Sequence, residues 1–348
     1  MTTVLSALTA LVALVMALAL LDQWRERRRP YQLVWAAGSL FFAVASGTEA
    51  LAAATGWDAG LLRVWYLTGA VLTAGWLGLG TALLLAKTRF GYAYAVLVAI
   101  AGVFMVLNNS RNHYPDVGPL VFGYLIVALI LALAIGVETY FANERWPRIA
   151  ALGTIGASVL AVYFVLTASL PAGPIALDPH GVPALDPLPG MLRLLAVFMS
   201  FTGGVSLLLG ALFSAYVFMP KKRVLDYSLD AEQKGDVMLF NLLIAPVALA
   251  VNFLASLPGA VKGLLLGRLH SRVPATLLIA VGALLISGTD FGVKSGSTEI
   301  FQASKLVGIG LIFGGFLVSN EAFREVRIPF TSIRLGGVRR ERTDSAAT

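Results

Sequence analysis

The sequence contains no cysteine and only three histidines among its 348 residues. Without cysteine there is no disulfide, no thiolate metal site, no cysteine nucleophile and no covalently attached haem. Charged residues are also scarce, at 13%, against about 25% in soluble domains. Hydrophobic residues reach 58%, against about 45–50% in soluble domains. The composition therefore excludes an ordinary water-soluble protein.

Long apolar runs recur along the chain between short polar breaks. A helix needs about 20 mostly apolar residues to cross a bilayer, and a helix satisfies its own backbone hydrogen bonds in lipid. We therefore predict an all-α fold, a polytopic integral membrane helical bundle. Seven candidate spans lie at residues 3–21, 31–54, 61–86, 90–108, 118–142, 149–170 and 191–219.

Basic residues are distributed unevenly around these runs. Arginines at 25, 27, 28 and 29 follow the first run and none precedes it, so the positive-inside rule predicts an external N-terminus. If successive spans then cross the membrane in alternating directions, 21 of the 26 basic residues lie in the cytoplasm. Five are left outside: Arg63, Arg111, Arg193, Lys294 and Lys305. Orientation thus explains the net charge of +7, and we predict no nucleic-acid partner.

The segment 237–256 is apolar enough to span, but counting it as a span would export the arginine-rich tail. We therefore interpret 237–267 as a re-entrant or interfacial segment on the cytoplasmic side. Two later runs, 274–289 and 303–319, bring the total to about nine spans, with a cytoplasmic C-terminus. The predicted units are a seven-span bundle (1–219), a polar cytoplasmic linker (220–236), the re-entrant or interfacial segment (237–272), a two-span hairpin (273–322) and a basic cytoplasmic tail (323–348).

Ionisable residues within spans are costly, so they are the first place to look for function. Glu49 lies toward the outer end of the second span, and Trp65 and Tyr66 begin the third. These residues would form a polar pocket in the outer leaflet. The alternative is structural, with Glu49 pairing with Arg63 across the turn. Lys305 is placed at the entrance of the last span.

A second polar feature lies in the segment 237–256. Asn241 and Asn252 are eleven residues apart and so share one helical face, and Pro246 lies between them. Broken helices that carry polar groups are typical of substrate paths in transporters. The two asparagines are therefore candidates for such a path.

The predicted external loops carry residue types that zinc or copper would use, namely His113, Asp116 and His180. Their spacing matches no compact metal motif, so solvated loop residues are the favoured interpretation. We predict no cofactor, because no span carries a histidine for haem or a mid-span lysine for retinal. The loop 171–190 contains six prolines, which favours a stiff extended cap over a helix.

The last span contains a GxxxG pair, Gly310 and Gly314, and the last two spans also carry Gly308, Gly315, Gly282 and Gly288. Small residues at this spacing let helix backbones approach closely in membranes. Packing inside the chain is the favoured interpretation, and association with another subunit is the alternative.

The second and third spans, with Glu49 near the end of one and Trp65 opening the next, are similar to the seven-helix membrane sensor modules of bacterial histidine kinases. Those modules continue into a cytoplasmic signalling domain, whereas this chain continues into further apolar segments. The resemblance implies a sensing role, and we assign the chain to no family on it.

Three classes of function remain. The first is a non-enzymatic multi-pass protein of the bacterial plasma membrane that acts through partners, as a sensor, scaffold or accessory subunit. Its expected partners are the lipid bilayer and either another membrane protein or a second copy of the chain. The alternatives are a transporter or channel for a small solute, and a membrane enzyme on lipid-linked substrates.

Overall fold

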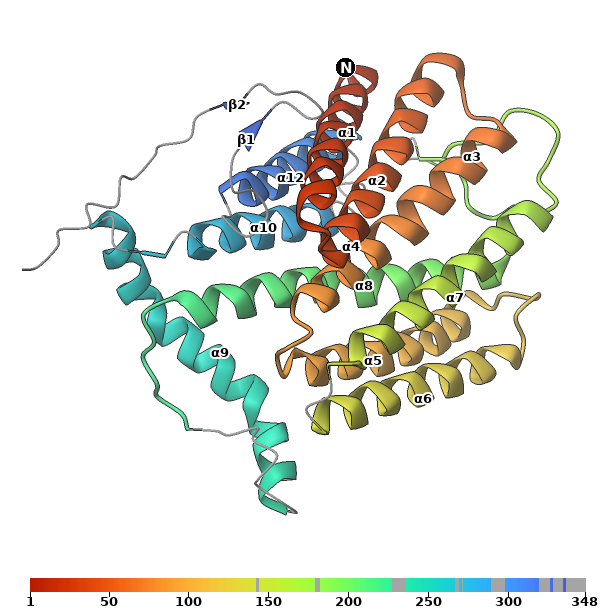
Figure 1. Cartoon of the computed structure of the whole chain (residues 1–348). Helices are drawn as coiled ribbons and strands as arrows, with labels where there is room; N and C mark the ends of the chain where they lie inside the picture. Colours follow the sequence, from red (N-terminus) through yellow and green to blue (C-terminus); the bar gives the residue numbers. More distant parts are fainter. Residues whose placement is uncertain are drawn as a thin grey trace, which may run out of the picture.

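The protein was analysed as a computed structural model, which describes residues 1–141, 144–178, 182–226, 236–266, 269–270, 272–288, 298–318, 326–327 and 334–335. For 236–243 and the last two short segments, only the backbone is described. Almost all of the described chain is helical (Figure 1). The helices are α1 (Thr2–Arg27), α2 (Pro30–Thr55), α3 (Ala59–Trp65), the π-helix η1 (Tyr66–Thr73), α4 (Ala74–Leu84), α5 (Phe90–Asn112), α6 (Leu120–Tyr140), α7 (Trp146–Thr167), α8 (Gly190–Phe218), α9 (Asp236–Leu265), α10 (Arg272–Ser287) and α12 (Thr298–Val318). Two antiparallel strands, β1 (Val326–Arg327) and β2 (Arg334–Leu335), follow.

Within the described residues, nine helices are long and apolar enough to cross a membrane. They are α1, α2, the continuous helix Ala59–Leu84 made of α3, η1 and α4, then α5, α6, α7, α8, the part of α9 from Ile244 to Leu265, and α12. The prediction of a polytopic helical membrane bundle is thus confirmed, and the protein is a multi-pass integral membrane protein. The nine helices are not the nine predicted spans. The prediction counted 274–289 and left out 237–256, whereas in the structure α9 is long enough to span and α10 has only 16 residues.

Local signals explain where several helices begin and end. Pro30 opens α2, where its missing N–H costs nothing. Asp58 caps α3, its side chain accepting a hydrogen bond from the backbone N–H of Leu61 at 2.8 Å. Arg28 and His113, which follow α1 and α5, adopt the left-handed conformation that commonly ends a helix.

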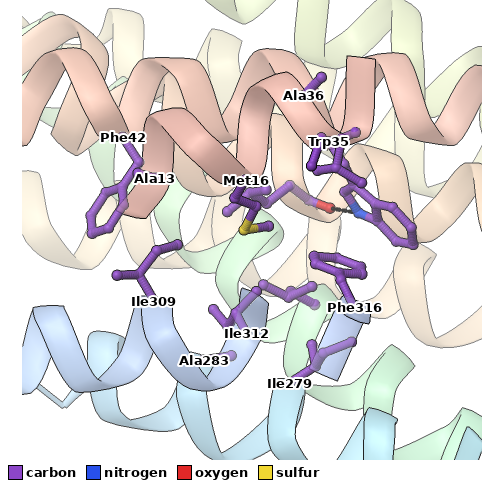
Figure 2. Close-up of a cluster of buried hydrophobic side chains, with 14 of the residues drawn as sticks. Ala13, Met16, Trp35, Ala36, Phe42, Ile279, Ala283, Ile309, Ile312 and Phe316 are labelled. Carbon is purple, nitrogen blue, oxygen red and sulfur yellow. Dashed lines mark hydrogen bonds between the residues drawn. The ribbon is translucent and has the colours of Figure 1, made fainter. Parts of the chain in front are cut away.

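The C-terminal hairpin shares a hydrophobic core with the first helices (Figure 2). Ala13, Phe42 and Ile309 lie at one end of this cluster, while Trp35 and Phe316 lie at the other with their ring centroids 4.7 Å apart. This register makes α12 antiparallel to α2 and parallel to α1. The C-terminal end of α12 therefore lies at the same end of the bundle as Arg28, as the predicted topology requires.

Glycines let several helix pairs approach closely. A Cβ atom added to Gly203 of α8 would lie 2.0 Å from the carbonyl oxygen of Ala74, so α8 and α4 touch backbone to backbone. In α12 the packed glycines are Gly308 and Gly315, whose added Cβ atoms would lie 2.9 and 2.5 Å from the carbonyl oxygens of Gly282 and Ala275 in α10. Packing inside the chain is thus found for Gly308 and Gly315 but not for Gly310 and Gly314, where added Cβ atoms meet nothing of the described chain within 4 Å.

Helix α9 lies apart from the other long helices. Figure 1 shows it running obliquely past the C-terminal end of α8 rather than alongside it. Ala260 of α9 packs with Ala215 and Met219 near the end of α8 and with Val273 at the start of α10. These contacts of α9 lie at one end of the bundle, and the re-entrant or interfacial assignment of 237–267 stays a prediction.

Candidate functional site

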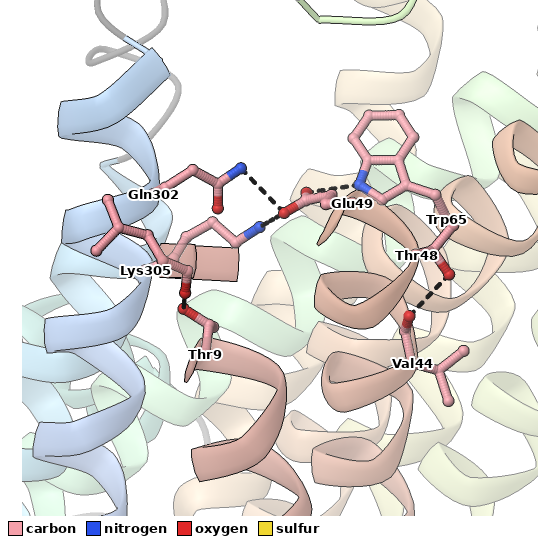
Figure 3. A network of polar contacts seen from close by, with 8 residues as sticks. Thr9, Val44, Thr48, Glu49, Trp65, Gln302 and Lys305 are labelled. Atoms are coloured by element: carbon pink, nitrogen blue, oxygen red, sulfur yellow. Dashed lines mark hydrogen bonds and ion pairs between the residues drawn. The ribbon is translucent and has the colours of Figure 1, made fainter. Parts of the chain in front are cut away.

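Glu49 and Lys305 form an ion pair inside the bundle (Figure 3). Lys305 Nζ lies 2.5 Å from Glu49 Oε2, and each side chain is only 7% exposed. Glu49 lies in the last third of α2, and Lys305 lies about two turns inside α12. The expected pairing of Glu49 with Arg63 does not form, because Arg63 Nη2 instead donates to the carbonyl oxygen of Ala168 at 2.6 Å.

Two further side chains donate hydrogen bonds to the Glu49 carboxylate. Trp65 Nε1 donates to Oε1 at 2.6 Å, and Gln302 Nε2 donates to Oε2 at 3.1 Å. Hydrogen bonds to a charged acceptor are about twice as strong as neutral ones. We call Glu49, Trp65, Gln302 and Lys305 the Glu49 cluster. It joins α2, the start of the third span and α12.

Aromatic rings extend the surroundings of Lys305. Its ammonium lies 5.0 Å from the ring centroid of Phe301 and 5.8 Å from that of Phe42. Both distances lie within the range of cation–π attraction, which grows when the cation is desolvated. The lysine thus has a carboxylate and two ring faces to offset the loss of water, which makes a buried charge at this depth tolerable.

The sequence indicated half of this cluster. Glu49 and Trp65 were predicted to lie close together, and the structure brings them into contact. Gln302 was not predicted, and Lys305 was placed at the entrance of a span starting at 303, whereas α12 starts at Thr298 and carries Lys305 inside the bundle. The available signal was that Gln302, Lys305 and Ile309 share one helical face.

The predicted pocket residue Tyr66 points elsewhere. It is 5% exposed and belongs to an apolar cluster that includes Ile175 and Leu192, so it takes no part in the Glu49 cluster. Tyr66 also begins η1, in which Thr73 Oγ1 donates to the carbonyl oxygen of Thr68, five residues earlier. Short π-helical segments inside α-helices are frequent at functional sites. Here one follows Trp65 directly.

A continuous set of contacts links the Glu49 cluster to the proline-rich loop. The rings of Trp65 and Trp57 pack edge to face with centroids 5.3 Å apart. The carbonyl oxygen of Trp57 accepts a hydrogen bond from the backbone N–H of Ile175 at 2.9 Å. The bond from Arg63 to Ala168 ties the start of the same loop to α3. The loop is thus anchored to the helix that supplies Trp65.

Several buried oxygens near the cluster have no hydrogen-bond partner within the described structure. They are Ser6 Oγ on α1, Ser46 Oγ on α2 and Gln302 Oε1 on α12. All three lie on the Glu49 side of the core residues Ala13, Phe42 and Ile309, as their positions along the three helices show. Buried polar atoms in proteins are normally paired with protein or with water. These three oxygens therefore lack the partners that buried polar atoms normally have.

The polar path predicted in α9 is not assembled around Asn252. This residue is 1% exposed, and its Oδ1 accepts hydrogen bonds from the backbone N–H groups of Val224 and Leu225 at 2.7 and 3.0 Å. Its Nδ2 donates to the carbonyl oxygen of Leu225 at 2.8 Å. The side chain therefore docks the segment after α8 onto α9. The side chain of Asn241 lies outside the described residues.

The candidate metal ligands are also dispersed. His113 ends α5 and is exposed, while Asp116 Oδ2 accepts a hydrogen bond from the backbone N–H of Gly190 at 2.8 Å. His180 lies outside the described residues. Among the residues that are described, no group of three or more histidine, aspartate or glutamate side chains is placed to hold a metal ion.

Comparison with family models, curated proteins and solved structures finds no match for the chain. The Glu49 cluster, with its link to the proline-rich loop, is consequently the feature from which a function can be argued.

Proposed function

We propose that the chain is a non-enzymatic membrane protein that acts through partners, and that it works as a sensor or accessory subunit in which the Glu49 cluster holds α12. The buried Glu49–Lys305 pair is the observation that carries this proposal. Ionisable residues at membrane depth are rare, usually pair with one another and mark functional sites. The two residues of this ion pair come from opposite ends of the sequence.

The position of the cluster supports a coupling role. On the predicted outer side it touches, through Trp65 and Trp57, the loop that a stimulus would meet first. On the other side it holds α12, which leads into the predicted cytoplasmic tail. Separating the pair would leave two unpaired desolvated charges, which is costly. Partly separated arrangements are therefore unfavourable, and the paired and separated states are distinct. A stimulus that moves Trp65 would shift α12 between them.

The outward glycines of α12 support the partner part of the proposal. Gly310 and Gly314 contact no other part of the described chain, so this side of α12 is open to a partner there. Small residues four apart suit close contact with another membrane helix, from a second copy or a different protein. The bias of basic residues supports placing the tail on the cytoplasmic side of a bacterial plasma membrane.

Purification of the full chain at native abundance tests this proposal. We expect a partner to co-purify with the wild type, and the neutral double variant Glu49→Gln/Lys305→Met to change the amount retained. The matched control is Lys87→Met/Glu144→Gln, which removes an exposed pair 3.5 Å apart and should change nothing. A wild-type chain that purifies alone, without a partner or a second copy, would overturn the proposal.

A transporter for a small solute is the second candidate, and the unpartnered oxygens beside the ion pair favour it. Intramembrane charged pairs also mark ion and proton pathways. Reconstitution into proteoliposomes separates the two functions. Proton or solute flux that is lost in Glu49→Gln, but kept in the Lys87→Met/Glu144→Gln control, would favour transport over sensing.

A further inference from the structure

A second polar region lies at the same end of the bundle, in a cleft separate from the Glu49 cluster. The segment after α5 and the end of the proline-rich loop border an open cleft of about 550 Å³ there. This volume lies within the range of about 300–1,000 Å³ that is usual for small-molecule sites. The lining includes Asn112, Tyr114, Asp116, Asp186 and Arg193.

The walls of this cleft are fixed in place. Gly190 donates its backbone N–H to Asp116 Oδ2 at 2.8 Å, which joins the two segments. A Cβ atom on Gly190 would lie 2.5 Å from Tyr114 Cβ, so the contact requires glycine. Tyr114 Oη bonds Asn108 Oδ1 at 3.2 Å, and three prolines (Pro115, Pro187 and Pro189) stiffen the rim.

Opposite charges stand side by side in the cleft. The Arg193 guanidinium lies 4.7 Å from the ring centroid of Tyr114, which orients it, and the Arg193 side chain is 22% exposed. Its Nη1 lies 3.7 Å from Asp186 Oδ1, a separation too long for a hydrogen bond. Within the described residues the guanidinium makes no hydrogen bond. It therefore presents several donors to the cleft, beside a carboxylate that is 93% exposed.

We infer that this cleft binds a small zwitterion, a molecule that carries an ammonium group and a carboxylate or phosphate a few bonds apart. Its anionic group would take a bidentate position on Arg193, and its ammonium would lie against Asp186. A simple anion would meet the repulsion of Asp186 and Asp116, and a simple cation that of Arg193. The inference concerns a separate site and does not depend on the proposed function.

Two sources carry this chemistry, a free amino-acid-like solute and the headgroup of a zwitterionic lipid. The cleft lies where the spans end, within reach of both. Calorimetric titration of the purified full chain in detergent with L-alanine and with phosphoethanolamine tests the free solutes. Thermal stability in nanodiscs of phosphatidylethanolamine against phosphatidylglycerol tests the lipid. Acetate, ethanolamine and inorganic phosphate are the singly functional controls.

We expect at least one zwitterionic probe to bind or stabilise the wild type, and the singly functional controls to do neither. Arg193→Gln and Asp186→Asn should each weaken that binding at least tenfold, and Arg193→Lys should restore part of it by keeping the charge. Arg111→Gln removes an exposed charge at the same end, outside the cleft, and should leave binding unchanged. The inference is overturned if neither the free zwitterions nor the lipid act on the wild type, or if Arg193→Gln and Asp186→Asn bind as the wild type does.

Discussion

At the scale of single residues, the buried Glu49–Lys305 pair carries a large electrostatic cost. Removing a carboxylate and an ammonium from water costs several kcal/mol for each ion, and a membrane interior offers no water to replace their hydration. The Glu49 carboxylate recovers part of this through three donors, from Trp65, Gln302 and Lys305. The pair is therefore stable only while both charges are present.

A double-mutant cycle should show this dependence. Lys305→Met leaves the Glu49 charge without a counter-ion, so we expect it to lower the free energy of unfolding by about 3–5 kcal/mol. Glu49→Gln strands the lysine and should cost a similar amount. The double variant should cost much less than the sum of the two, because no charge is left unpaired. Denaturant unfolding in mild detergent measures all three.

The exposed pair Lys87–Glu144 provides the comparison. Its side chains are 81% and 58% exposed, so solvent already screens the interaction. The cycle Lys87→Met with Glu144→Gln should show a coupling of at most about 1 kcal/mol. Equal couplings for the buried and the exposed pair would mean that the Glu49 cluster does not restrain α12.

At the scale of elements, glycine position decides which helices pack. In α12, Gly308 and Gly315 are seven residues apart and face α10, where added Cβ atoms would lie 2.9 and 2.5 Å from its carbonyl oxygens. Gly310 and Gly314 lie between them on the sequence but contact no other part of the described chain. Since every neighbour is apolar, hydropathy gives no sign of which glycine face is inward. The sequence pointed to both sets of glycines, and spacing alone could not show which set is packed.

Two alanine substitutions separate these roles. Gly203→Ala would place a methyl group 2.0 Å from the carbonyl oxygen of Ala74, so α8 and α4 must move apart. We expect a loss of about 1–3 kcal/mol in unfolding free energy. Gly310→Ala meets open space and should be neutral, or stabilising by up to about 1 kcal/mol through helix propensity. Thermal unfolding in detergent compares them, and a Gly310→Ala variant as unstable as Gly203→Ala would contradict the packing described.

At the scale of the whole molecule, the sequence predicted what depends on local composition and missed what depends on distant pairing. The first seven spans were found because each is a long apolar run, and the structure contains a helix for each. The partner of Glu49 lies 256 residues away, and no periodicity links positions so far apart. Composition could identify Glu49 as a costly residue, but only the packing of α12 against α2 identifies Lys305 as its counter-ion.

The placement of α9 shows the same limit. Apolarity and length make Ile244–Leu265 a candidate span, while the bias of basic residues opposes it. In the structure, Asn252 holds Val224 and Leu225, and Arg272 lies over the ring of Phe218 at 4.3 Å. The start of α10 thus lies at the end of the bundle where α8 ends. If α9 crossed the membrane fully, α10 would instead start at the opposite end.

The absence of cysteine allows this topology to be tested directly, because each introduced cysteine is the only thiol in the chain. Val224→Cys before α9 and Leu266→Cys after it replace side chains that are 55% and 56% exposed. We expect both to be shielded from a membrane-impermeant maleimide in intact cells and to react once the membrane is opened. Ala172→Cys, in the exposed part of the proline-rich loop, should react in intact cells and is the matched control. If position 266 reacts in intact cells while position 224 does not, α9 crosses the membrane, and the interfacial placement of 237–267 is wrong.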